Sequence, residues 1–178
     1  MKKYLRVGVG TLIGVGIILY LVFRPMSYEI PVNSEQGSMG ITMLKPNLDY
    51  NVKTNEYAVY NESKSYSVPE KEALELKKEI LELVCQLKYY RTPFTLINNV
   101  KEENLIYKTE ESVWITSVRT AEVLDRNRYD NDIKVAGKYI IINGKMYSLG
   151  MEGEEKAAWL YEEIEALLQE KAGDYLNK

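Results

Sequence analysis

Residues 138–149 read Lys-Tyr-Ile-Ile-Ile-Asn-Gly-Lys-Met-Tyr-Ser-Leu, and this stretch carries the strongest local structural signal in the chain. Asn143 and Gly144 stand between two β-prone runs, and both residue types tolerate the positive φ of a type I′ turn. A two-residue turn places Ile142 opposite Lys145 and then pairs the residues on either side in order. The stretch therefore predicts a tight antiparallel hairpin.

Further short strands are predicted on the N-terminal side of this hairpin. Residues 105–108 and 113–118 show a period of two around a four-residue loop, which favours a second hairpin. Residues 133–136 add a strand ahead of the first hairpin, and 41–44 and 57–60 are shorter candidates. We expect an antiparallel sheet of four or five strands.

Two amphipathic helices complete the predicted domain. The first follows Ser67 and Glu70, which have capping-box spacing, and its apolar positions repeat at steps of three and four as far as Leu87. The second runs over 152–172, with acidic residues at its start and Gly173 as its stop. Each helix has one apolar face that a sheet can cover, so the predicted fold class is α+β.

The N-terminal segment carries no charge from Val7 to Phe23. A helix of about twenty residues rises about 30 Å, which matches the thickness of a hydrocarbon layer. Three basic side chains precede the segment and one, Arg24, follows it, which predicts a cytoplasmic N-terminus. No small-residue cleavage site follows, so we expect a single N-terminal transmembrane helix that stays uncleaved.

The predicted organisation has four parts: a cytoplasmic stub at 1–6, a transmembrane anchor at 7–24, a juxtamembrane tether at 25–40 and an extracytoplasmic α+β domain at 41–178. The predicted localisation is the cell membrane, with the domain outside the cytoplasm. The layout resembles that of small bitopic envelope proteins of Gram-positive bacteria, in plan and composition rather than in a motif.

The composition excludes several kinds of chemistry. The chain has no histidine and a single cysteine, Cys85, so it lacks the commonest general base, the usual zinc ligand and any intrachain disulfide. All 26 acidic residues follow Arg24, and the net charge of −3 argues against a nucleic-acid partner. We expect no cofactor.

Acidic residues offer two candidate chemistries. The run 125–132 has oxygen donors at alternate positions, as calcium loops do, but Asp130 stands where glycine is required, and Arg126 and Arg128 repel a cation. We therefore predict a solvated loop and no metal site. Paired carboxylates that hydrolyse an envelope polysaccharide are an alternative function, although no motif selects a pair, and no catalytic residue is assigned.

Two sets of residues are candidates for packing or binding. The first set, Gly10 and Gly14, forms a G-x-x-x-G pair that could let two anchor helices approach closely and form a homodimer, while the alternative is that glycine is simply frequent in membrane helices. The second set consists of tyrosines, which offer large contact areas at interfaces but equally suit the margin of a core. Its members are Tyr57, Tyr60, Tyr66, Tyr89 and Tyr90.

The leading functional hypothesis is a non-enzymatic, membrane-anchored interaction domain outside the cytoplasm. Such a domain serves as an accessory or immunity-type component of a bacterial envelope, with the membrane and another envelope protein as its partners. Tethering to a plane raises its effective concentration towards neighbours, so a modest interface suffices. A passive domain that dimerises through its anchor is a further alternative.

Overall fold

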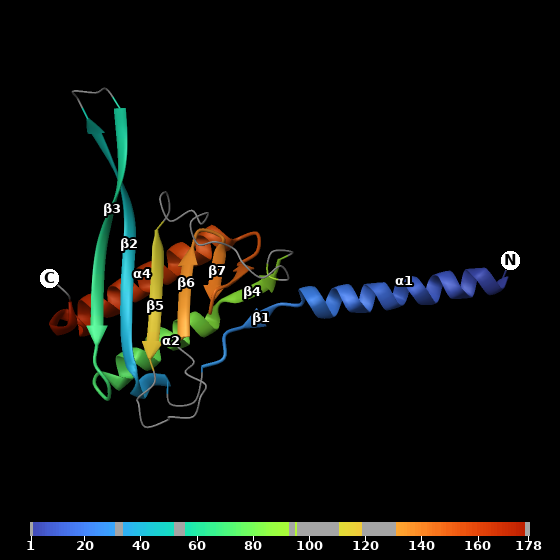
Figure 1. The fold of residues 1–178 in the computed structure, drawn as a ribbon, viewed down its shortest axis with the longest axis horizontal. Coiled ribbons are helices and arrows are strands. Elements are labelled where there is room, and N and C mark those ends of the chain that lie inside the picture. The colour runs from blue at the N-terminus through green and yellow to red at the C-terminus, as the bar shows by residue number, and fades with distance from the viewer. Residues whose placement is uncertain are drawn as a thin grey trace.

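The computed structural model describes residues 2–30, 34–51, 56–92, 95, 111–118 and 131–176, with only the backbone at 2–10, 21, 48–51, 56–60, 118 and 131. Within these residues, eight antiparallel strands form one sheet in the order β1-β4-β8-β7-β6-β5-β2-β3 (Figure 1). The strands are β1 Met26–Ser27, β2 Ser38–Asn51, β3 Glu56–Val68, β4 Lys88–Arg91, β5 Ser112–Val118, β6 Asn131–Ala136, β7 Tyr139–Ile142 and β8 Lys145–Ser148. The helices are α1 Lys2–Phe23, α2 Leu74–Gln86 and α4 Gly153–Lys171, with short 3-10 turns at η1 Ser34–Gln36 and η3 Gly173–Tyr175.

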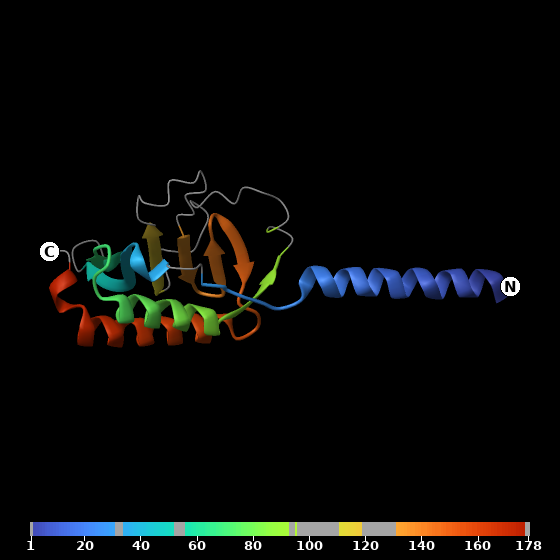
Figure 2. The same ribbon diagram turned by 90° about the horizontal axis from the view of Figure 1, so that it is seen from below.

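Helices α2 and α4 lie side by side against one face of the sheet (Figure 2). Alternate residues of β2 point towards them, since Met39, Ile41 and Met43 are at most 1% exposed. From the helices, Ile80 of α2 and Ile164 of α4 are fully buried in the same hydrophobic cluster. The period of two in the strands and the apolar faces of the helices therefore meet in one core.

The hairpin predicted over 138–149 is confirmed. β7 and β8 pair with Ile142 opposite Lys145 and Ile141 opposite Met146. Asn143 and Gly144 have φ values of 51° and 75°, as a type I′ turn requires. The backbone N–H of Asn143 also donates to the backbone carbonyl of Asp132, at 2.8 Å, so the turn is held against the start of β6.

The predicted fold class is wrong in its sheet, which has eight strands in the described residues rather than four or five. β2 and β3 are far longer than the short candidates at 41–44 and 57–60. Their positions away from the helices include small residues such as Ser38, Gly40 and Ser65, which have little β-strand signal of their own. β1, at two residues, is too short to leave a periodic pattern.

The predicted C-terminal helix is confirmed, but the predicted start of the first amphipathic helix is wrong. α4 runs over Gly153–Lys171, close to the predicted 152–172. Ser67 does not cap a helix, because β3 continues through Val68 and α2 begins only at Leu74. Lys71 and Ala73 have positive φ values of 59° and 43°, so the chain turns sharply there and the capping box cannot form.

The structure contradicts the predicted transmembrane helix, and with it the single-pass membrane localisation. Among the residues that the structure describes, none of the helices combines the length and the apolar character needed to cross a membrane. The side chains of α1 are described only over 11–23, Leu21 apart.

Helix α1 extends away from the body of the protein (Figures 1 and 2). After it, Met26 and Ser27 pair with Tyr89 and Lys88 of β4, and Tyr28 is buried, so part of the predicted tether at 25–40 is built into the fold. Eight of the large apolar side chains described in α1 are 40–74% exposed: Leu12, Ile13, Val15, Ile17, Ile18, Leu19, Tyr20 and Phe23.

A buried lysine joins two turns beneath the sheet. Lys77 of α2 is fully buried, and its ammonium donates to the carbonyl of Gly37 at 2.7 Å and to that of Pro69 at 2.6 Å. Burial lowers the pKa of Lys77, and the nearby Glu72 and Glu70 carboxylates oppose this shift. The side chain therefore fixes the start of β2 against the turn that leads from β3 into α2.

We expect Lys77→Met to lower the free energy of unfolding by about 1–3 kcal/mol, because it leaves two carbonyls without their donor. Urea denaturation measures the change. Lys78→Met is the matched control, since Lys78 is exposed and makes only a 3.9 Å ion pair with Glu82. A loss at Lys77 no larger than that at Lys78 would contradict the role of the buried ammonium.

Gly153, the first residue of α4, leaves no room for a side chain. A Cβ there would lie 2.6 Å from Lys138 Cβ and 2.7 Å from Lys138 Cα. Gly153→Ala is therefore expected to cost about 1–3 kcal/mol by overpacking. Gly173→Ala is the control, since a Cβ at Gly173 meets nothing within 4 Å. Equal thermal denaturation midpoints for the two variants would show that the close approach has no energetic weight.

Candidate functional site

The longest projection from the sheet is a two-stranded ribbon, which we call the β-arm and define as residues 45–51 and 56–62. β2 and β3 pair continuously from Met39 opposite Val68 to Asn51 opposite Glu56. β5 pairs with β2 only as far as Leu44, so the ribbon continues beyond its neighbour (Figure 1). Seven residues of strand extend roughly 20 Å.

The base of the β-arm is fixed to the body by ion pairs. Lys45 of β2 lies 3.0 Å from Glu111, and Lys64 of β3 lies 2.9 Å from Glu165 of α4. Hydrogen bonding to these carboxylates raises the pKa of both lysines. The Lys45 ammonium also lies 6.0 Å from the ring centroid of Tyr161. These contacts hold the helix-facing side of the arm in a defined position.

The outer edge of β3 is the free edge of the sheet. β3 is the last strand in the order, and on its outer side Tyr66 is bridged by Leu176, which follows the η3 turn. Asn61, Glu62 and Ser63 are exposed on this edge. An edge strand of this length presents a row of backbone donors and acceptors that another strand can pair with.

The predicted tyrosine surface is not brought together in one place. Tyr66 and Tyr89 are buried, at 6% and 8% exposure, and Tyr90 is half-buried. Tyr57 and Tyr60 lie on β3, but their side chains are outside the described residues. β3 and β4 are the eighth and second strands in the sheet order, so the two groups of tyrosines lie far apart.

The glycine pair predicted for helix packing is described in part. A Cβ added at Gly14 meets nothing within 4 Å, so this side of α1 is open within the described residues. The surroundings of Gly10 lie outside them. Dimerisation through Gly10 and Gly14 stays a prediction.

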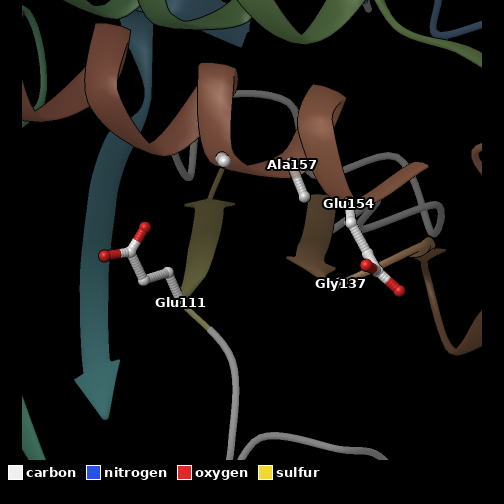
Figure 3. Close-up of a pocket in the computed structure, with 5 residues that line it drawn as sticks. Glu111, Gly137, Glu154 and Ala157 are labelled. Atoms are coloured by element: carbon white, nitrogen blue, oxygen red, sulfur yellow. The ribbon is translucent and has the colours of Figure 1, made fainter. Parts of the chain in front are cut away.

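A small hollow lies beside the start of α4, with a volume of about 200 Å³ and a lining of Glu111, Gly137, Glu154, Ala157 and Ala158 (Figure 3). Glu111 and Glu154 stand at opposite sides of it, and their carboxylates point away from each other. Glu111 is paired with Lys45 at 3.0 Å and Glu154 with Lys138 at 3.5 Å. The hollow therefore brings two acids near one another without the facing arrangement that glycoside hydrolysis uses.

The predicted loop at 125–132 lies outside the described residues except at its end. There Asp132 pairs with Lys134 at 3.3 Å. Within the part of the chain that the structure describes, no three acidic or cysteine side chains gather as metal ligands do.

Sequence reasoning did not find the β-arm or the free edge of β3. A signal was present, because Met39, Ile41 and Met43 alternate with Gly40 and Thr42 in the pattern of a half-buried strand. Comparison of this chain with protein families, curated proteins and solved structures finds no match. Its function is therefore argued from its own geometry.

Two buried phenols make the fold sensitive to alkali. Burial raises the pKa of Tyr28 to about 12, and burial together with the Glu165 carboxylate raises that of Tyr161 to about 12. Unfolded tyrosines ionise near pH 10. Between about pH 10 and 12 the folded state therefore keeps protons that the unfolded state has lost, and stability falls as pH rises.

We expect the free energy of unfolding to decline over that range, as measured by urea denaturation at several pH values. Tyr161→Phe removes one of the two contributing phenols and should make the decline shallower. Ultraviolet absorbance of phenolate gives an independent readout, because the buried tyrosines should ionise together with unfolding. An unchanged slope in the variant would contradict the assignment.

Proposed function

We propose that this chain is a non-enzymatic binding domain that contacts a protein partner through its β-arm. The observation that carries the proposal is the continuation of β2 and β3 beyond β5 as a ribbon with its base fixed by ion pairs. An isolated two-stranded hairpin is marginal in water, so a projecting ribbon gains stability when another chain covers it.

The chemistry of the arm suits a protein rather than a nucleic acid. Its described side chains mix both charges with neutral polar groups: Lys45 and Glu62 are opposite each other in register, and Asn47 donates to Glu62 at 3.2 Å. Phosphate binding needs a concentrated basic patch, which this pattern does not supply. Strand addition, in contrast, draws its affinity from backbone groups such as those on the outer edge of β3.

The polysaccharide hydrolase alternative gains no support from the described acids. Hydrolysis needs one carboxyl held neutral and another facing it across the substrate. Glu111 and Glu154 are each paired with a lysine and point apart (Figure 3). The binding function is therefore the one that the geometry favours.

Photo-crosslinking from the arm tests the proposal. A benzophenone amino acid replaces Asn61, which is exposed on β3, in the full chain produced in its own cells. A discrete crosslinked product is expected, since a bound partner lies within reach of the arm. Benzophenone in place of Met151, which is 105% exposed and lies outside the arm, is the matched control and should give no such product.

Removal of the arm gives the complementary test. Lys45 and Glu62 are direct partners in register, so an Asn-Gly turn can join them in place of residues 46–61. This variant should keep the thermal denaturation midpoint within a few degrees and should not compete for the partner in the crosslinking assay. Full competition by the arm-less variant, or equal crosslinking from both benzophenone positions, would overturn the proposal.

A further inference from the structure

A short segment at the first edge of the sheet is attached by few contacts. We define residues 26–30, which contain β1, as the strap. In the described part of the chain its backbone pairs with β4 at two positions, Met26 opposite Tyr89 and Ser27 opposite Lys88. Two side chains reinforce this pairing. The Lys88 ammonium donates to the Ser27 hydroxyl at 2.6 Å, and the Tyr89 hydroxyl donates to the Ser27 carbonyl at 3.2 Å.

The strap covers a thiol. Cys85, near the end of α2, is half-buried, and it packs against the same core as Met26 and Ile30 of the strap. Burial raises the pKa of the Cys85 thiol, and a hydrogen bond from the Ile30 backbone opposes this shift. The thiol therefore contacts the strap directly, and its accessibility reports whether the strap is attached.

The buried ring of the strap carries a polar group that opposes its burial. Tyr28 is 7% exposed, and within the described residues its hydroxyl has no hydrogen-bond partner. Water satisfies this hydroxyl when the strap is released, whereas attachment removes the water without supplying a replacement. The apolar ring favours the attached strap and the hydroxyl favours the released one, so the free-energy difference between the two states is reduced.

Space beside the strap leaves room for its release. A hollow of about 500 Å³ lies there, with a lining of Arg24, Pro25, Met26, Ser27, Glu29 and Tyr89. Helix α1, which precedes the strap, extends away from the body of the protein (Figures 1 and 2). A segment that few contacts hold opens locally before the rest of a fold does.

We propose that the strap is a detachable cover, which leaves β4 and Cys85 while the rest of the fold stays intact. Release frees the outer edge of β4, where the backbone groups opposite the strap become available to another strand. The attached strap is thus an autoinhibitory contact, because it occupies the edge that such a strand would use. The strap and the β-arm lie at opposite ends of the sheet order, so this inference does not depend on the proposed binding function.

Alkylation of Cys85 by iodoacetamide in the full chain measures the release. Because release exposes little surface, the alkylation rate at low urea concentration should change only slightly with urea. If alkylation required global unfolding, the rate would instead rise with the slope of global unfolding, and that result would overturn the proposal. A rate as high as that of the urea-unfolded chain would also overturn it, since the thiol would then be uncovered.

Two buried tyrosines provide matched variants with opposite expected effects. Tyr28→Phe removes the hydroxyl that has no partner, so it favours the attached strap and should slow alkylation of Cys85 by about tenfold. Tyr89→Phe removes the donor to the Ser27 carbonyl and should speed alkylation by about threefold to tenfold. Both variants keep the aromatic ring. Equal rates, or shifts in the same direction, would show that the strap does not control access to the thiol.

A disulfide between the strap and β4 tests the geometry directly. Ser27 and Lys88 are opposite each other in an antiparallel pair, which places their Cα atoms about 4.5–5.5 Å apart, within disulfide range. Ser27→Cys with Lys88→Cys should form this disulfide under mild oxidation, and alkylation of Cys85 should then be about tenfold slower or more than in the natural chain.

Thr42→Cys with Ser65→Cys is the matched control, because these residues are also opposite each other but join β2 to β3. Its disulfide leaves the strap free, so Cys85 should be alkylated at the natural rate. Mass spectrometry of peptides verifies each disulfide and quantifies the alkylated thiol. Equal alkylation of Cys85 in the two oxidised chains would overturn the proposal.

Discussion

The double pairing of β2 is the constraint on which the rest of this structure depends. Over 39–44 this strand is hydrogen-bonded on one side to β3 and on the other to β5, while Met39, Ile41 and Met43 are sealed beneath the helices. Packing fixes the direction and register of the strand, because a slip of one residue would turn all three apolar side chains to the opposite face. The β-arm continues this strand, and the pairing and packing of 39–44 fix the position from which the arm projects.

The fixed position of β2 also accounts for the buried Lys77, whose ammonium joins the turn before β2 to the turn after β3. The carbonyl of Gly37, just before β2, and that of Pro69, just after β3, both accept from the same ammonium. Lys77 supplies the donors from the helix side and is itself fully buried. A buried cation is stable only where such acceptors surround it, so the turns and the lysine depend on each other.

Elements whose local sequence selects a single backbone conformation were predictable from sequence. Asn143-Gly144 selects one turn and one register, and the long amphipathic pattern before Gly173 selects a helix. The full length of the β2–β3 ribbon was not, because its pairing is decided by tertiary contacts and several of its outward positions carry serine or glycine. Ser67 and Glu70 have capping spacing, but two residues with positive φ at the following turn delay the helix to Leu74.

The candidate site was less predictable than the fold. Tyrosine content indicated a contact surface, but the sheet order separates Tyr66 from Tyr89 by most of the width of the molecule, and both are buried. Side-chain type alone does not say which residues share a face. Edge position, which decides where backbone groups are free, follows from strand order, and strand order is a long-range property that no short motif encodes.

The attachment of α1 to the sheet decides which pairing would bear a pulling force first. α1 leads directly into β1, which is held to β4 by the pairs Met26 with Tyr89 and Ser27 with Lys88. Tension applied along α1 falls first on this short strand, which can peel away one pair at a time. Because only two residue pairs join β1 to β4, we expect a pull on α1 to separate β1 from the sheet before it disturbs the packed interior around β2.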